Sequence, residues 1–320
     1  MMDIYRSDRE MVVVALGGNA LIRPGDKPDI ETQEANAEKT VVSLLPLVER
    51  DYNIVITHGN GPQVGNLLLR EECSKEHLPR MPLDVLVAET EGSMGYLLQQ
   101  AFLNQLRKKQ IKRYVVTVIT QVIVDPNDPA FARPSKPIGM FYDEEKAKEL
   151  KEEYGWEMIQ DGDRGMRRVV PSPRPLKIVQ RHMIRHSSRE GNIVIAGGGG
   201  GIPVKVMKGG EYEGVEAVID KDLTSSMLAS EINADTLVIL MQEPKVFVDY
   251  ATAEQRPLDK VTRSEITDYL AEGHFPPGPI GPKVDAAIQF VQRGGRQAII
   301  TSAERLAQSL DGQDGTRIVP

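Results

Sequence analysis

Cysteine is nearly absent from this sequence, in which Cys73 is the only one among 320 residues. A single thiol excludes an intramolecular disulfide and any metal site built from several cysteines. Because scarce cysteine is typical of proteins kept in a reducing compartment, we predict a cytoplasmic location.

Long apolar runs and an excess of positive charge are also missing. No stretch approaches the roughly 18 apolar residues that a membrane-spanning helix needs, and residues 1–10 are charged rather than apolar. The 39 lysines and arginines are outnumbered by 46 aspartates and glutamates, which gives a net charge of -7. A chain without a broad positive field does not attract nucleic acid or anionic lipid, so we predict that neither is a partner.

Glycine, in contrast, is concentrated in three turns that each follow an apolar run. The turns are Gly17, Gly18 and Asn19 after residues 11–16, Gly59, Asn60 and Gly61 after residues 54–57, and residues 197–201 after residues 193–196. Residues without side chains let the backbone approach an anion, and a following helix adds N–H donors. A single such turn is more often a plain connection, but three together predict one extended oxyanion site.

The chemistry that these turns favour is phosphoryl transfer. Glycine loops with isolated lysines and acidic residues suit a reaction that needs positioning and charge neutralisation more than covalent help. The chain has no GxxxxGK[ST] loop, no protein-kinase motif set and no evident Ser-His-Asp set or metal-ligand cluster. Two common phosphotransferase classes are therefore excluded, and a different kinase fold is required.

Short apolar runs alternate with long amphipathic stretches, which is the pattern of α/β proteins. We predict strands within 11–16, 54–57, 115–124, 193–196 and 236–241, and helices over 30–49, 62–72, 223–231 and from 283. The strands lack polar alternation, which indicates burial on both faces of a mostly parallel sheet. The predicted fold class is α/β, a three-layer α/β/α sandwich around a mostly parallel open sheet.

Residues 126–186 depart from this pattern because they are rich in proline and charge. We predict that they form an inserted, protruding lid subdomain with one helix over 142–153. The chain exceeds the usual size of a single core, so we expect either one large domain over 1–320 with this insert or two domains.

Seven motifs, in order from about residue 11 to the C-terminus, resemble the carbamate kinases of the amino acid kinase family. They are LGGNAL at 16–21, THGNGPQVG at 57–65, KPIG at 136–139, RRVVPSP at 167–173, GGGGGIPV at 197–204, EAVIDKD at 216–222 and GPK at 281–283. The resemblance implies reversible phosphoryl transfer between ATP and carbamate, with Mg²⁺ bound to ATP or ADP. It also implies arginine or related nitrogen catabolism and a homodimer whose sheets join across the interface.

The resemblance assigns an N-terminal lobe, 1–205, to carbamate or carbamoyl phosphate and a C-terminal lobe, 206–320, to the nucleotide. Carried over residue by residue, the transferred phosphoryl and carbamoyl oxygens would be held by Gly17, Gly18, Asn19, Gly59 and Asn60. Charge on the phosphates would be neutralised by Lys136, Lys221 and Lys283, which Asp220 would orient. Two alternatives stay open, namely a helix N-cap at Asp220 and a surface position for Lys283.

The nucleotide side is implied in the same way, and no residue is assigned as a metal ligand. The nucleotide residues would be Leu240, Met241, Lys245, Val246, Tyr250, Phe275, Gly281 and Lys283. Carbamate is already an oxyanion, so no general base is needed. We therefore interpret His58 as a turn residue whose ring forms a local hydrogen bond.

The sequence departs from the family pattern at several positions. Met241 and Gln242 replace a hydroxyl and a carboxylate, and Pro279 replaces a common serine. Glu91 replaces a usual glutamine, which we expect to add negative charge near the dimer or substrate side. These changes leave two alternatives open: a non-catalytic nucleotide or metabolite sensor on the same fold, and a related kinase that acts on another small acid.

Overall fold

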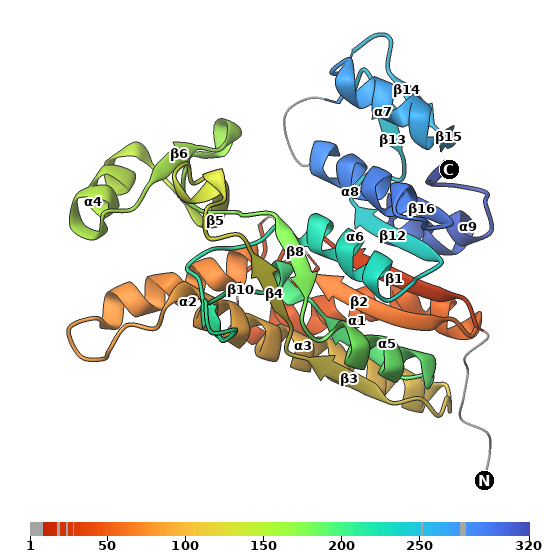
Figure 1. Ribbon diagram of the computed structural model, residues 1–320, viewed down its shortest axis with the longest axis horizontal. Coiled ribbons are helices and arrows are strands. Elements are labelled where there is room, and N and C mark those ends of the chain that lie inside the picture. Colours follow the sequence, from red (N-terminus) through yellow and green to blue (C-terminus); the bar gives the residue numbers. More distant parts are fainter. Residues whose placement is uncertain (1–8, 18–19, 24, 28, 251, 276–279) are drawn as a thin grey trace.

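The computed structural model describes residues 9–17, 20–23, 25–27, 29–250, 252–275 and 280–320. Its centre is an eight-stranded sheet with the order β15-β17-β16-β12-β1-β2-β9-β3 (Figure 1). All neighbouring strands are parallel except β16 and β17. The strands are β1 (Met11–Leu16), β2 (Asn53–His58), β3 (Val115–Val118), β9 (Ile193–Ala196), β12 (Thr236–Met241), β15 (Lys260–Thr262), β16 (Gln297–Ser302) and β17 (Thr316–Val319).

Helices cover both faces of this sheet. One face carries α1 (Ile30–Glu49), α3 (Leu83–Lys108) and α9 (Leu306–Leu310), and the other carries α5 (Arg181–Arg189), α6 (Lys221–Glu231) and α8 (Ile280–Gln292). Strand β1 shows why: Val12 and Val14 pack into the apolar cluster under α1 and α3, whereas Val13 and Ala15 pack into the cluster under α6 and α8. Because successive side chains of a strand point to opposite faces, an all-apolar strand needs both layers. The predicted three-layer sandwich is confirmed.

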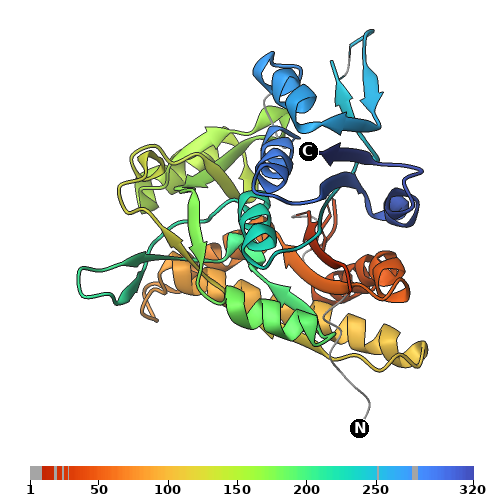
Figure 2. The ribbon, with the colours of Figure 1, turned by 45° about the vertical axis from the view of Figure 1, so that its right-hand side comes forward.

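A small sheet with its own helix projects from the body of the molecule, as Figures 1 and 2 show. It consists of β5 (Lys136–Tyr142), β6 (Met158–Gln160), β7 (Met166–Val170) and α4 (Glu144–Tyr154). The helix begins two residues later than predicted because Asp143 is its N-cap and accepts a hydrogen bond from the backbone N–H of Lys146. We call these four elements the lid. The predicted limits of the lid and of the two lobes stay predictions.

The run 115–124, predicted as a single strand, is divided between two sheets. Strand β3 ends the main sheet, and β4 (Gln121–Val124) joins β8 (Pro175–Ile178), β10 (Ile202–Val206) and β11 (Tyr212–Gly214). The break falls at Thr120, whose hydroxyl accepts a hydrogen bond from the N–H of Gly197 at 2.9 Å. The backbone N–H of Thr120 donates to Glu91, and its carbonyl accepts from the N–H of Ile202, so its backbone groups are not used to extend the ladder of β3.

The remaining elements are α2 (Gly61–Ser74), α7 (Arg263–Ala271), β13 (Val246–Val248) and β14 (Arg256–Leu258). Sequence patterning did not predict α3, although it is the longest helix in the described part of the chain, with 26 residues. Among the described residues, no helix combines the length and the apolar character that crossing a membrane would require.

Candidate active site

The three predicted lysines meet at the first turn of α6. Lys136 comes from β5 of the lid, Lys221 opens α6 and Lys283 lies in the first turn of α8. The Nζ of Lys136 donates to Asp220 Oδ2 at 2.6 Å, and the Nζ of Lys283 donates to Asp222 Oδ2 at 2.9 Å. Segments far apart in the sequence therefore place three ammonium groups around one short acidic stretch.

The carboxylate that pairs with two of these lysines is Asp222, which was not predicted. Its Oδ1 accepts from Lys221 and its Oδ2 from Lys283. Asp220, predicted to orient the lysines, accepts only from Lys136 among them and also caps α6 by accepting from the N–H of Asp222. Asp220 thus holds one of the three lysines, its N-cap alternative is confirmed, and its predicted catalytic role stays a prediction. The Asp-Lys-Asp sequence at residues 220–222, just before a predicted helix, is the sequence signal that could have identified Asp222.

Because this cluster is buried, the charge of each of its side chains strongly affects the pKa of its neighbours. The side chains of Lys221, Asp222 and Lys283 are 12%, 3% and 13% exposed. Burial by itself would raise the pKa of Asp222, but the ammonium groups of Lys221 and Lys283 outweigh it and hold that pKa well below its usual range. Burial lowers the pKa of Lys221, although Asp222 opposes this shift. A buried charge of either sign is costly without its partner, so the positive groups are held in place before any ligand arrives.

The second and third glycine turns pack directly against each other. A Cβ on Gly198 would lie 2.5 Å from the imidazole of His58, and one on Gly199 would lie 2.2 Å from the amide of Asn60. Asn60 in turn donates to Thr90 Oγ1 at 2.8 Å. The glycine-rich turn is therefore required by close packing, because any larger side chain would displace the residues behind it.

This packing corrects part of the expected oxyanion site. The N–H groups of Gly197, Gly200 and Gly201 bond to Thr120 Oγ1 and to the carbonyls of Gly197 and Gly198. These three donors are used inside the protein. Gly59 and Asn60 lie between β2 and α2. Gly17 follows β1, and Gly18 and Asn19 lie outside the described residues.

Two buried titratable groups flank Gly198. Burial lowers the pKa of His58 to about 4, and its Nδ1 lies 3.2 Å from the carbonyl oxygen of Gly59, which confirms the local hydrogen bond. Glu91 is also buried, and it accepts from the N–H of Thr120 at 2.8 Å. Burial raises the pKa of Glu91 well above its usual range. Burial therefore opposes the negative charge that we expected Glu91 to add, and that expectation stays a prediction.

The predicted nucleotide residues divide into core and surface positions. The side chains of Leu240, Val246 and Phe275 are 4%, 0% and 7% exposed and belong to the apolar core. They are available to a ligand chiefly through their backbone. Met241 is half-buried at the end of β12, and Gly281 lies in the first turn of α8.

Two further predicted nucleotide residues have partners of their own. Lys245 pairs with Asp259 and lies 3.5 Å from Asp314, so its ammonium is already neutralised. Tyr250 is 46% exposed, and its ring centroid is 6.1 Å from that of Phe247. Pro279, one of the departures from the family pattern, lies outside the described residues.

No group of three or more His, Cys, Asp or Glu side chains that could hold a metal ion occurs within the described ranges. Mg²⁺ in nucleotide-dependent enzymes is commonly bound by one or two carboxylates together with the phosphates and water. Asp220 and Asp222 lie beside the lysines, but both carboxylates already bond to ammonium groups, so we assign neither as a metal ligand.

The amino acid kinase family is the class that this fold and site define. The model of that family matches residues 10–302, and the chain belongs to it. A carbamate kinase from Thermococcus kodakarensis is 48% identical over 311 residues, which are 96% of this chain and 98% of that protein. A carbamate kinase from Giardia lamblia bound to citric acid is 41% identical, with a TM-score of 0.93 over 98% of this chain and 99% of that one. The Giardia enzyme bound to AMP-PNP is also 41% identical, with a TM-score of 0.90 over the same shares.

Proposed function

We propose that this protein is a carbamate kinase, which transfers a phosphoryl group reversibly between ATP and carbamate. The observation that carries the proposal is the meeting of Lys136, Lys221 and Lys283 at the start of α6. Curated carbamate kinases at 48% identity over nearly the whole chain support the choice of acceptor. The nucleotide analogue in the Giardia structure supports ATP as the donor.

The lysines supply what phosphoryl transfer needs. Charge on the migrating group and on the leaving phosphate must be neutralised, and preorganised cations do this without reorganisation during the reaction. Carbamate carries no proton on its attacking oxygen, so the mechanism requires no general base. The neutral, buried imidazole of His58 agrees with this. Gly17, Gly18, Asn19, Gly59 and Asn60 would position the transferred phosphoryl and carbamoyl oxygens.

Mg²⁺ would enter with ATP or ADP and add positive charge at the phosphates. Asp220 and Asp222 are the described carboxylates nearest to the lysine cluster, and each is already bonded to lysine. We therefore assign these aspartates mainly to holding the ammonium groups in place.

Turnover tests the proposal directly. The purified protein mixed with carbamoyl phosphate, ADP and Mg²⁺ should form ATP, measured by a luminescent assay, and the variants Lys221→Ala and Lys283→Ala should lose this activity while remaining folded. Lys260→Ala, an exposed residue of β15, is the matched control. Tight nucleotide binding without ATP formation would instead favour the sensor alternative. Activity with another small acid, and none with carbamate, would favour the related kinase.

We also propose a cytoplasmic homodimer that acts in arginine or related nitrogen catabolism. Strand β3 is the outer strand at one end of the main sheet, so its edge is available for continuation of the sheet into a second copy. Tyr114 and Ile119, which flank β3, are 80% and 45% exposed. An apolar pair beside an open strand edge suits an interface between identical chains.

A further inference from the structure

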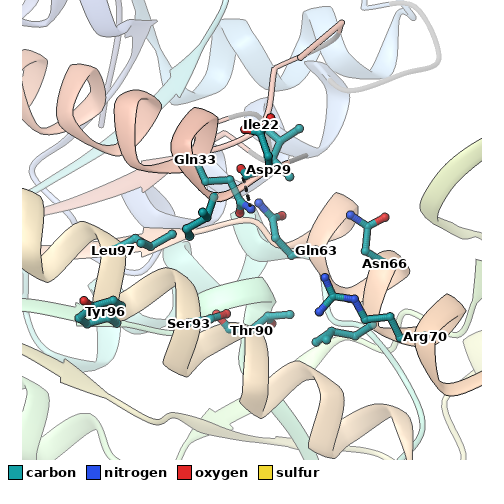
Figure 3. A pocket seen from close by; sticks show the side chains of 12 residues that line it. Ile22, Asp29, Gln33, Gln63, Asn66, Arg70, Thr90, Ser93, Tyr96 and Leu97 are labelled. Carbon is teal, nitrogen blue, oxygen red and sulfur yellow. Dashed lines mark hydrogen bonds between the residues drawn. The ribbon is translucent and has the colours of Figure 1, made fainter. Parts of the chain in front are cut away.

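A cavity of about 410 Å³ lies between α1, α2 and α3 (Figure 3). Polar groups line it from α2 and α3, and apolar side chains such as Leu97 complete its wall. None of the three lysines lines it, and neither does Gly59 or Asn60. The lining therefore includes none of the described residues that we assign to phosphoryl transfer.

Gln63 is the first sign that this cavity is built for a ligand. Its side chain lines the cavity, and the residue is only 9% exposed. Within the described part of the chain, neither its Oε1 nor its Nε2 has a hydrogen-bond partner. A buried carboxamide with no partner is unfavourable, and native proteins rarely retain one without a reason. A bound acceptor such as a carboxylate oxygen would satisfy Nε2, whereas Oε1 requires a hydrogen-bond donor.

Arg70 is the second, independent sign. Gln63, Asn66 and Arg70 follow one another at i, i+3 and i+7 on α2, so one face of the helix presents all three to the cavity. No carboxylate in the described ranges forms an ion pair with Arg70. In Figure 3 its guanidinium extends from α2 toward Thr90. An unpaired guanidinium beside two carboxamides is a set of donors suited to a carboxylate.

We propose that this cavity binds a small aliphatic monocarboxylate, with its carboxylate on Arg70 and Gln63 and its chain against Leu97. The planar guanidinium matches a carboxylate in geometry, and the apolar wall suits a short hydrocarbon chain. Asp29, which lines the opposite side at the start of α1, limits the ligand to one negative charge. A dicarboxylate would bring its second charge toward this residue.

One hydrogen bond connects the proposed site to a residue that we assign to phosphoryl transfer. Thr90 lines the cavity and accepts a hydrogen bond from Asn60 Nδ2. The inference does not depend on the proposed function, because binding can be read directly on the whole protein whether or not it transfers a phosphoryl group.

Ligand-observed NMR titration tests the proposal with pentanoate as the probe. The wild-type chain should bind pentanoate saturably, bind the uncharged pentanamide at least about tenfold more weakly, and bind glutarate more weakly than pentanoate. Arg70→Gln and Gln63→Leu should each weaken pentanoate binding by about tenfold or more. Arg293→Gln, which changes an arginine at the end of α8, is the matched control and should bind as wild type does.

Gln63→Leu removes two buried polar atoms and Arg70 is exposed, so both variants should fold; thermal unfolding checks this. The proposal is overturned if pentanoate does not bind, if pentanamide binds equally well, or if folded Arg70→Gln and Gln63→Leu bind pentanoate as tightly as the control. Binding that is lost only in the Lys221→Ala variant would assign the probe to the transfer site and would also overturn it.

Discussion

At the scale of single residues, Asp222 is the position on which the candidate site depends most. It is the shared partner of Lys221 and Lys283, and its side chain is 3% exposed. Removing one partner from a buried ion pair leaves an uncompensated charge, which is more damaging than the pair is stabilising. Asp222 therefore controls both the stability of the first turn of α6 and the position of two ammonium groups.

We expect Asp222→Asn to lower the free energy of unfolding by about 3 kcal/mol, because two buried ammonium groups lose their counter-charge. ATP formation should also fall by more than tenfold. Urea unfolding and the turnover assay check the two effects. Asp259→Asn is the control, since its side chain is 75% exposed beside Lys245, and it should change stability by about 1 kcal/mol or less. Equal effects of the two substitutions would contradict this account.

Glu91 gives a pH-dependent prediction. Its pKa is higher in the folded protein than in the unfolded chain because the carboxyl is buried. Its contribution to stability is therefore full at pH below its unfolded pKa of about 4.3 and is lost as pH rises toward the folded pKa. Glu91→Gln keeps an acceptor for the N–H of Thr120 and removes this loss. We expect the variant to be more stable than wild type at pH 8 and close to wild type at pH 4, as measured by urea unfolding at both values. A variant that is less stable at pH 8 would show that the buried group is needed as a carboxylate.

At the scale of elements, the contact between α2 and the lid strand β5 places Lys136. Gly65 of α2 and Gly139 of β5 touch backbone to backbone, and a Cβ on Gly65 would lie 1.9 Å from the Cα of Gly139. Gly139 has φ +76°, a conformation that other residues rarely adopt. Since Lys136 opens the same strand, this glycine contact sets how closely the lid approaches α6.

Gly65→Ala should push β5 away from α2 and move Lys136 out of reach of Asp220. We expect at least a tenfold loss of turnover and a loss of stability of about 1–3 kcal/mol from overpacking. Gly92→Ala in α3 is the matched control, because nothing lies within 4 Å of the added Cβ. It should be neutral or slightly stabilising, as alanine favours a helix over glycine. Turnover assays and thermal unfolding compare the two, and full activity of Gly65→Ala would remove this contact from the positioning of Lys136.

At the scale of the whole molecule, the open edge of β3 is the feature on which the proposed homodimer depends. An isologous dimer would place the same edge and the same flanking residues on both sides of a two-fold axis. A single charged substitution would then appear twice and repel itself across the interface.

Light scattering should give the purified protein twice the mass of one chain. Ile119→Lys should shift it toward the monomer, with a larger shift at low salt because screening is weaker there. Leu78→Lys, which is equally apolar and 63% exposed in the connection between α2 and α3, should remain a dimer. A monomeric wild type, or a dimer unaffected by Ile119→Lys, would count against joining of the sheets at β3.

The amino-acid sequence by itself determined the three layers and several of the elements that build them. Helix α1 and strands β1 and β12 occur at the predicted residues, because an apolar strand or an amphipathic helix is a local pattern that burial on two faces or one face makes stable. The presence of three lysines and three glycine turns near predicted element ends was also visible. Helix α3 was missed because its apolar residues are interrupted by glycine and polar side chains.

Only the tertiary structure decided which groups meet. Residues 136, 221 and 283 come together because Lys136 at the start of the lid strand β5 reaches the N-terminus of α6, and because α8 packs beside α6. No spacing along the chain encodes either contact. The same holds for the choice of Asp222 over Asp220, for the packing of Gly198 against His58, and for the cavity that Gln63 shares with Arg70. Local patterns depend on neighbours in sequence, whereas these contacts depend on the order of strands and the crossing of helices.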